Sequence, residues 1–204
     1  RKRQMSASGH TIVVRPLTGA DREAALDDLA RLRIEVFQAY PYLYDGSLDY
    51  ERDYLAEFAA SDGAVLVAAF DDDRVIGAAT GAPMAGQKAE FSRPFEAAGH
   101  DPAGIFYFGE SVLLPGYRGR GIGHAFFDHR EAAATEANKS ICAFCAVVRP
   151  GDHPLRPAGY TPLDAFWRKR GYAPADGLVT ELSWTDIGEA AETRKPMQFW
   201  MKRT

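Results

Sequence analysis

The sequence predicts an α/β (α+β) fold, in which helices flank a central, mixed and mostly antiparallel sheet. Two observations predict this class. Short apolar runs of strand length alternate along the chain with stretches of helical periodicity. The strand–turn–helix–strand segment over residues 105–148 also requires a right-handed crossover between two parallel strands. The chain has 204 residues, 46% of them hydrophobic, which suits one domain. We expect a disordered N-terminal tail over residues 1–10 and a single domain over residues 11–204.

The elements before residue 61 are one strand and two helices. Thr11–Arg15 is rich in β-branched residues, which predicts the first strand. Thr18 and Asp21 have the spacing of a capping box, so a helix should begin there and continue to about Ala39. A second helix is expected over Asp49–Ala60.

The middle of the chain predicts three strands and a long connection. Apolar runs at 64–70 and 74–81 are separated by three aspartates, a pattern typical of a hairpin. Residues 83–104 form a connection with three prolines, of which residues 90–98 have some helical character. Connections of this length in a compact domain are often functional. The strongest strand signal is the apolar run over 105–114.

The last part of the chain begins with a turn rich in Gly and Arg, which leads into a helix over 121–137. A strand follows at 141–148, and then a stiff, polar, proline-rich loop over 149–162. A short helix at Leu163–Arg170 should end at Gly171, which has the position of a C′ glycine. The two last apolar runs predict strands over 178–184 and 197–202.

Composition excludes several classes of protein. The net charge is −4, whereas a nucleic-acid-binding domain usually carries a basic excess. No apolar run approaches the roughly 18 residues of a membrane span, and no apolar segment of a secretory signal follows the first five residues. Cys142 and Cys145 are the two cysteines and should point to opposite faces of one strand. They are therefore expected to be buried thiols of a protein in the reducing cytoplasm.

The turn before residue 124 carries the clearest chemical signal. Glycines at 119, 121 and 123 remove side chains from the chain between a strand and a helix. Main-chain N–H groups at a helix N-terminus, together with the helix dipole, favour a bound phosphate. Arg118 and Arg120 add positive charge. The turn is thus predicted to hold a pyrophosphate; the alternative is a tight turn without a ligand.

Two common phosphate-binding motifs do not fit this turn. A Walker A loop requires Gly-Lys-Ser/Thr, and no Lys-Ser/Thr follows here. A dinucleotide fingerprint requires G-x-G-x-x-G, and the spacing here is G-x-G-x-G.

The pattern Arg118-x-x-Gly121-x-Gly123 after a strand resembles motif A of the GNAT superfamily of N-acetyltransferases, Gln/Arg-x-x-Gly-x-Gly/Ala. The first strand and helix, the segment 110–123 and the segment 165–172 are also similar to that family. The resemblance implies the acyl-CoA N-acyltransferase fold, with a parallel fourth and fifth strand. It implies an enzyme that uses acetyl-CoA as co-substrate, without a metal. Such an enzyme transfers an acetyl group to a primary amine by direct attack in a ternary complex.

The resemblance also implies a cofactor site. Main-chain amides of the turn would hold the CoA pyrophosphate, and the free backbone of the preceding strand would pair with the pantetheine arm. An N–H near Val112 would be the oxyanion donor. The implied cofactor residues are Val112, Leu113, Leu114, Arg118, Gly119, Arg120, Gly121, Ile122 and Gly123.

Two residues are candidates for proton transfer. Glu110 has the position of the family's general base, and strand alternation would place it on one face with Phe106 and Phe108, whose apolar surroundings suit that role. The alternative is a carboxylate at a solvated strand end. Many family members carry a tyrosine four residues before the glycine of the late helix, where this chain has Trp167. Tyr160 is the nearest upstream phenol and is either the general acid or a packing residue.

The substrate would contact the variable loops. Tyr40, Tyr42, Tyr44 and Asp45 could hold a cationic amine by cation–π and ionic contacts; ordinary surface is the alternative for each of them. The connection 83–104 and the loop 149–162 would form other walls, and Arg149, His153 and Arg156 in the latter would suit a carboxylate or a phosphate.

The expected binding partner is a small-molecule or peptide amine, and binding to nucleic acid or to a membrane is not expected. The protein is expected to be a monomer or a homodimer. The alternative function is a non-catalytic acyl-CoA sensor or interaction module of the same fold, which Trp167 leaves open.

Overall fold

The computed structural model describes residues 2–5 and 11–204, whose strands form one eight-stranded sheet in the order β1-β2-β3-β4-β5-β6-β8-β7. β5 and β6 are parallel, and all other neighbouring strands of the described residues are antiparallel. This confirms the predicted mixed sheet. The strands are β1 (Lys2–Met5), β2 (Thr11–Pro16), β3 (Val65–Asp71), β4 (Arg74–Pro83), β5 (Ile105–Leu113), β6 (Ile141–Val147), β7 (Ala173–Trp184) and β8 (Thr193–Arg203).

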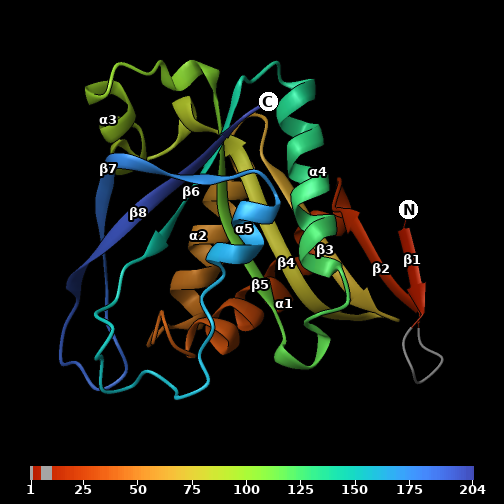
Figure 1. Ribbon diagram of the computed structural model, residues 1–204. Coiled ribbons are helices and arrows are strands. Elements are labelled where there is room, and N and C mark those ends of the chain that lie inside the picture. The colour runs from red at the N-terminus through yellow and green to blue at the C-terminus, as the bar shows by residue number, and fades with distance from the viewer. Residues whose placement is uncertain (1, 6–10) are drawn as a thin grey trace.

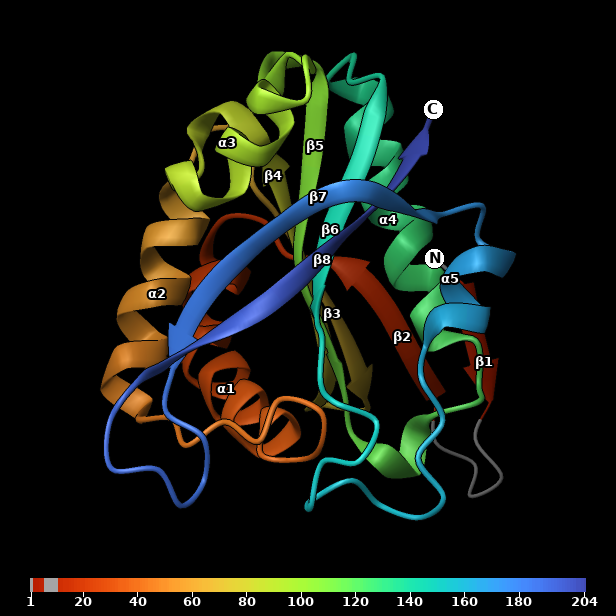
Figure 2. The same ribbon diagram turned by 60° about the vertical axis from the view of Figure 1, so that its left-hand side comes forward.

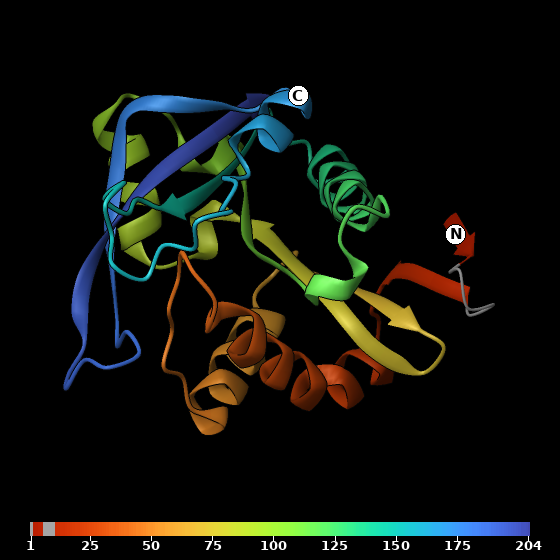
Figure 3. The same ribbon diagram turned by 60° about the horizontal axis from the view of Figure 1, so that its bottom comes forward.

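The helices cover both faces of this sheet. α1 and α2 lie on one side of β2–β4, and α4 lies on the other (Figure 3). The long β7–β8 hairpin forms the end of the sheet beyond β6, and its turn comes down beside the loop that joins α1 to α2 (Figure 2). The helices are α1 (Ala20–Phe37), α2 (Leu48–Ala60), α3 (Ala89–Ala97), α4 (Ile122–Glu136) and α5 (Asp164–Lys169), with single 3₁₀ turns η1 (Met84–Gly86), η2 (Pro102–Gly104) and η3 (Pro115–Tyr117).

Three details differ from the sequence-based expectations. Lys2–Met5 form β1, where a disordered tail is expected, and residues 1 and 6–10 of that tail lie outside the described residues. The capping box is wrong: α1 is capped by Gly19 without a side-chain hydrogen bond, and the Asp21 carboxylate pairs with Arg15 at 2.8 Å instead. β7 begins at Ala173, earlier than the predicted residue 178.

Side chains of β6 alternate between two apolar clusters on opposite faces. Cys145 packs with residues of α3, β7 and β8, whereas Cys142 packs with residues of α4 and the chain around Tyr172. The two thiols are therefore buried, free and separated by the sheet, as predicted. Burial raises the pKa of Cys142 to about 11 and that of Cys145 to about 12, so both are unreactive thiols at neutral pH.

A β-bulge interrupts the pairing of β4 with β5. Ser111 pairs with Ala79 but Phe108 pairs with Gly81, so Gly109 and Glu110 together face the single residue between them on β4. A Cβ at Gly109 would lie 2.4 Å from the Thr80 hydroxyl oxygen, which explains the glycine there. The extra residue reverses the alternation of β5 and decides which face Glu110 occupies.

Candidate functional site

β5 and β6 separate soon after they begin. Their parallel pairing runs from Ile105–Ile141 to Tyr107–Ala143, after which β6 turns away toward β8 (Figure 1). The residues that follow, 108–113 of β5 and 144–147 of β6, are not paired with each other, and we call them the fork. One edge of β5 in the fork is therefore open to pairing with another extended chain.

The open edge presents particular N–H groups. The Leu114 N–H donates to the Ile76 carbonyl of β4 at 3.0 Å. Because donors alternate along an antiparallel ladder, the N–H of Val112 also points toward β4, whereas those of Ser111 and Leu113 point into the fork. Of the N–H groups near Val112, those of its two neighbours are therefore the ones directed into the fork.

The glycine turn lies directly after this edge. Gly119 and Gly121 have φ of 75° and 77°, a backbone conformation that favours glycine, and the turn from Arg118 to Gly121 is exposed. α4 begins at Ile122, and the N–H groups of its first turn have no partner within the helix. The Arg118 N–H, in contrast, donates to the Pro115 carbonyl at 3.2 Å. The Arg118 N–H is therefore already engaged within the turn.

The first turns of α4 also border a small pocket. Gly121, Ile122 and His124 line it from α4, and Ile12 and Val14 line it from β2, together with Ala125 and Asp128. Its volume is about 170 Å³. The N–H groups at the start of α4 therefore lie beside this pocket.

Glu110 lies on the opposite face of the sheet from Phe108, against α1 and α2. Its carboxylate accepts from the Arg33 guanidinium at 2.6 Å and from the Tyr54 hydroxyl at 3.4 Å. Arg33 also binds Glu51, which accepts a hydrogen bond from Tyr44 at 2.7 Å. We call Arg33, Tyr44, Glu51, Tyr54 and Glu110 the Arg33 cluster. The predicted shared face of Glu110 and Phe108 is wrong, because the bulge turns Glu110 to the other side.

The charges of the Arg33 cluster are buried. The exposed fractions of the side chains are 11% for Arg33, 1% for Glu51 and 6% for Glu110. Burial raises the pKa of Tyr54, and the neighbouring carboxylate of Glu110 raises it further. Burial opposes the charge of Arg33, but Glu110, Tyr54 and Glu51 outweigh burial and raise its pKa. At neutral pH the phenols are protonated and Arg33 is charged.

Arg130 of α4 occupies the other side of the bulge. Its guanidinium donates to the carbonyls of Thr80 and Glu110 at 3.3 and 3.1 Å and to the Ser111 hydroxyl at 2.8 Å. It lies over the Phe108 ring at 4.3 Å from the ring centre and is 1% exposed. Burial lowers the pKa of Arg130 to about 10, so the side chain is still charged at neutral pH and holds the bulge in place.

The loop around Tyr40 and the predicted wall loop 149–162 come together. Tyr40 packs edge-on against Tyr160, with ring centres 4.7 Å apart, and also contacts His153. The Arg156 guanidinium lies over the Tyr160 ring at 5.1 Å. Burial raises the pKa of Tyr160.

The four predicted substrate residues do not form one pocket. Tyr42 packs against Phe37 and Trp184, and Tyr44 belongs to the Arg33 cluster. Asp45 is exposed. Of the four side chains, that of Tyr40 makes ring contacts with the loop 149–162.

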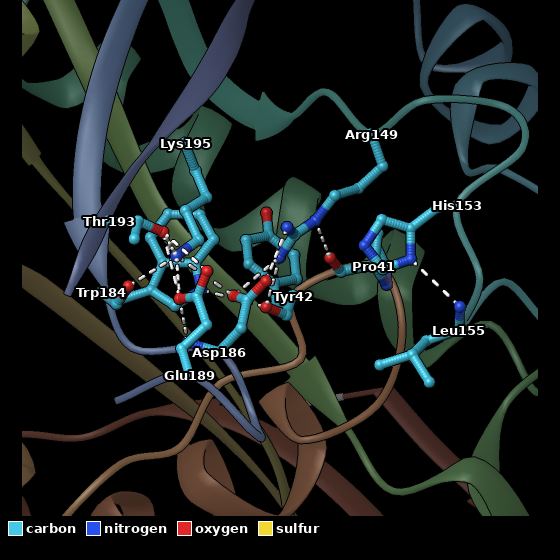
Figure 4. Close-up of polar contacts among 10 residues, drawn as sticks. All are labelled: Pro41, Tyr42, Arg149, His153, Leu155, Trp184, Asp186, Glu189, Thr193 and Lys195. Carbon is cyan, nitrogen blue, oxygen red and sulfur yellow. Dashed lines mark hydrogen bonds and ion pairs between the residues drawn. The ribbon is translucent and has the colours of Figure 1, made fainter. Parts of the chain in front are cut away.

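Arg149 has a structural role instead of the predicted anion-binding one. Figure 4 shows its guanidinium between the α1–α2 loop and the β7–β8 turn. It binds the Asp186 carboxylate through two hydrogen bonds of 2.7 and 2.9 Å, and it donates to the Pro41 and Tyr42 carbonyls at 2.7 and 2.8 Å. Lys195 reinforces Asp186 at 3.4 Å. Four of its five N–H donors are engaged in these bonds, and its side chain is 9% exposed, so Arg149 has little capacity left to bind a substrate.

Three buried charged side chains on helices are not predicted from the sequence, although a signal is present. Arg33, Glu51 and Arg130 each fall on the apolar stripe of a helix: Arg33 four residues before Phe37, Glu51 four before Leu55, and Arg130 four after Phe126. A charged residue at such a position indicates a buried polar partner.

Trp167, at the position expected for a tyrosine, packs against Phe144 and Trp200. Among residues 2–5 and 11–204, no group of His, Cys, Asp and Glu is arranged to hold a metal ion. Within the same residues, no helix has the length and apolarity needed to cross a bilayer.

A model of the "Acetyltransferase (GNAT) family" matches residues 26–158. No match is found among curated proteins.

Solved structures match at low identity, which shows a shared fold. The ribosomal-protein-alanine N-acetyltransferase of Brucella melitensis is 17% identical, with a TM-score of 0.62 over 94% of this chain and 99% of its own. An aminoglycoside 6′-N-acetyltransferase in complex with coenzyme A is 14% identical, with a TM-score of 0.59 over 94% and 96%. A Salmonella typhimurium protein solved with acetyl-CoA is 11% identical, with a TM-score of 0.55 over 94% and 93%.

Proposed function

Because the chain belongs to the acetyltransferase (GNAT) family, we propose that it transfers an acetyl group from acetyl-CoA to a primary amine by direct attack in a ternary complex. The observation that carries this proposal is the exposed Arg118–Gly121 turn, which leads into α4 next to the fork. Main-chain donors for a diphosphate and an unpaired strand edge for an extended amide chain thus lie side by side.

The residues of this chain fit acetyl-CoA. The N–H groups of Gly119, Arg120, Gly121, Ile122 and Gly123 would hold the pyrophosphate, since a Cβ at Gly119 meets nothing within 4 Å and the turn is exposed. The fork edge of β5 would pair with the pantetheine arm through the main chain of Leu113, which Val112 and Leu114 flank with their own N–H groups directed toward β4. Bound acetyl-CoA would supply an activated thioester. Two of the similar structures, solved with CoA and with acetyl-CoA, support this assignment.

The acceptor would approach from the α1–α2 face, where Glu110 lies. The amine nitrogen forms a bond to the acetyl carbon, the carbon–sulfur bond breaks, and the sulfur leaves as thiolate. Glu110 takes the proton of the amine, directly or through a water. The N–H of Ser111 or Leu113 stabilises the negative charge on the carbonyl oxygen. Tyr160 is the candidate proton donor to the thiolate, since a phenol is protonated at neutral pH and burial raises the pKa of this one further.

The acceptor is proposed to be a cationic amine. The Arg33 cluster contains two carboxylates and one guanidinium, so it has an excess of negative charge. Tyr40 and Asp45 would contact the acceptor directly. Tyr42 and Tyr44 would act by holding the loop, because their side chains are engaged elsewhere.

The test is release of free thiol from acetyl-CoA across a panel of polyamines, amino acids, aminoglycosides and peptide amines. We expect acetyl-CoA to raise the Tm and at least one amine to release thiol. A chain that binds acetyl-CoA tightly but acetylates no amine of the panel would be a sensor, and the proposal would be wrong.

Glu110→Gln tests the proton acceptor. The amide is isosteric but cannot take the proton, so we expect kcat at neutral pH to fall by roughly 100-fold or more. The rise in Tm with acetyl-CoA should be nearly unchanged, because the turn lies elsewhere. Glu57→Gln on the exposed side of α2 is the matched control and should retain activity. An unchanged pH–rate profile in Glu110→Gln would exclude Glu110 as the base.

A further inference from the structure

The Arg33 side chain is fixed on all sides. Nε binds Glu51 and Nη1 binds Glu110 at 2.6 Å. The guanidinium lies over the rings of Tyr54 and Phe37, 4.5 and 5.2 Å from their centres. One immobile cation is thus shared between a carboxylate on β5 and a carboxylate on α2.

We infer that Arg33 is a positioning residue that orients the Glu110 carboxylate as proton acceptor, and that Glu51 opposes it by competing for the same guanidinium. The pH above which the enzyme can accept the proton of the amine is then set by Arg33 and Glu51 together. This inference rests on the proposed function, because it assigns a role to Glu110 in acetyl transfer. A neighbouring positive charge favours an ionised carboxylate, and a neighbouring negative charge disfavours it.

Few other groups around Glu110 can titrate in the acidic range. Burial raises the pKa of Tyr44, Tyr54 and Tyr107, so these phenols stay neutral. Cys145, which contacts Tyr107 from β6, is a neutral thiol there because burial raises its pKa to about 12. Arg130 from α4 contacts the main-chain carbonyl of Glu110 at 3.1 Å and remains charged. Arg33 and Glu51 are therefore the charges that compete at the carboxylate.

Removal of Arg33 and removal of Glu51 should shift the acidic limb of the profile of kcat/KM against pH in opposite directions. Arg33→Met removes the attraction, and the limb of kcat/KM should move up by roughly 1 to 3 pH units. Glu51→Gln removes the competing negative charge and leaves the guanidinium to Glu110, so the limb should move down. Arg33→Lys retains a positive charge and should return the limb toward that of the wild type. Loss of packing alone would not give opposite shifts.

A double variant protects the test against misfolding. Arg33→Met leaves Glu51 buried without its cation, which is destabilising. In Arg33→Met/Glu51→Gln one positive and one negative charge are removed together, so the net charge of the Arg33 cluster is that of the wild type. Glu110 then lacks both the Arg33 guanidinium and Glu51, which competes with it for that guanidinium. Arg33 contacts Glu110 directly, so the loss of Arg33 should outweigh the loss of Glu51. We therefore expect the acidic limb of the double variant to lie between those of the wild type and Arg33→Met.

The experiment measures kcat/KM against pH for the wild type and the four variants, with one amine acceptor identified by thiol release. The acceptor's own ionisation is common to all five proteins and cancels in the comparison. The rise in Tm with acetyl-CoA is measured in parallel and should be retained in every variant.

The possible outcomes separate the two proposals. If the wild type transfers acetyl to no amine, the proposed function and this inference both fail. If the wild type is active but the limbs of Arg33→Met and Glu51→Gln coincide or move together, this inference alone is wrong. A variant that loses the effect of acetyl-CoA on Tm also contradicts the inference, because the change then reaches beyond Glu110.

Discussion

Gly121→Asp is expected to abolish the rise in Tm that acetyl-CoA causes and to reduce kcat/KM to background. The substitution places a carboxylate at the cap of α4, where the pyrophosphate should sit, and the two anions repel each other. At a concentration 100 times Kd, a ligand stabilises a protein by about 2.7 kcal/mol. For a chain of this size, that corresponds to a rise of roughly 5 to 10 °C. The measurement is thermal unfolding with and without acetyl-CoA.

Two controls separate charge from structure. Gly121→Asn has the same size, tolerates the positive φ of 77° and lacks the charge, so it should retain part of the shift. Gly86→Asp introduces the same carboxylate at an exposed site with open space around the new Cβ and should retain all of it. A normal acetyl-CoA response in Gly121→Asp would show that the turn does not bind the cofactor.

Arg149→Ala should lower the free energy of unfolding more than any other single substitution proposed for this protein. Asp186 is 8% exposed. After the substitution, Lys195 at 3.4 Å is the remaining cationic partner of its carboxylate among the described residues. The substitution also removes the donors to the Pro41 and Tyr42 carbonyls. Breaking a buried pair in this way costs about 3 kcal/mol, which would lower the Tm by roughly 6 to 12 °C. Thermal unfolding without ligand measures it.

Arg156→Ala is the matched control for this prediction. Arg156 lies in the same loop, but it is exposed and its contacts are stacking on Tyr160 and Tyr40, so the Tm should change little. In Arg149→Met/Asp186→Asn the buried charge is removed together with its partner, and we expect less destabilisation than in Arg149→Ala. If Arg149→Ala and Arg156→Ala lower the Tm equally, the ion pair does not hold the loops together.

The glycine turn could be predicted from sequence because its conformation is local. A strand, three glycines and a helix fix the direction of the N–H groups without reference to any distant residue. The parallel β5–β6 pair follows from the same segment through the handedness of crossovers. The boundaries of most helices and strands follow similarly from periodicity within each element.

The face of Glu110 could not be predicted in this way. Strict alternation along β5 places Glu110 with Phe108, and only the register of β5 against β4 shows that Gly109 inserts an extra residue opposite Thr80. The glycine itself is a sequence signal for a bulge, but its effect depends on the partner strand. The ion pair between Glu110 and Arg33 could not be predicted either, because Arg33 lies 77 residues earlier in the chain and no local sequence pattern relates the two residues.

The fork has a consequence for how ligand binding and folding are related. In an uninterrupted sheet, each interior strand receives main-chain hydrogen bonds from both neighbours, but β5 has them on one side only beyond Tyr107. An extended amide chain lying in that space would supply the absent bonds and would itself act as a strand. Cofactor binding would then complete the sheet, so part of the cohesion between the β1–β5 and β6–β8 halves would come from a molecule that the sequence does not encode.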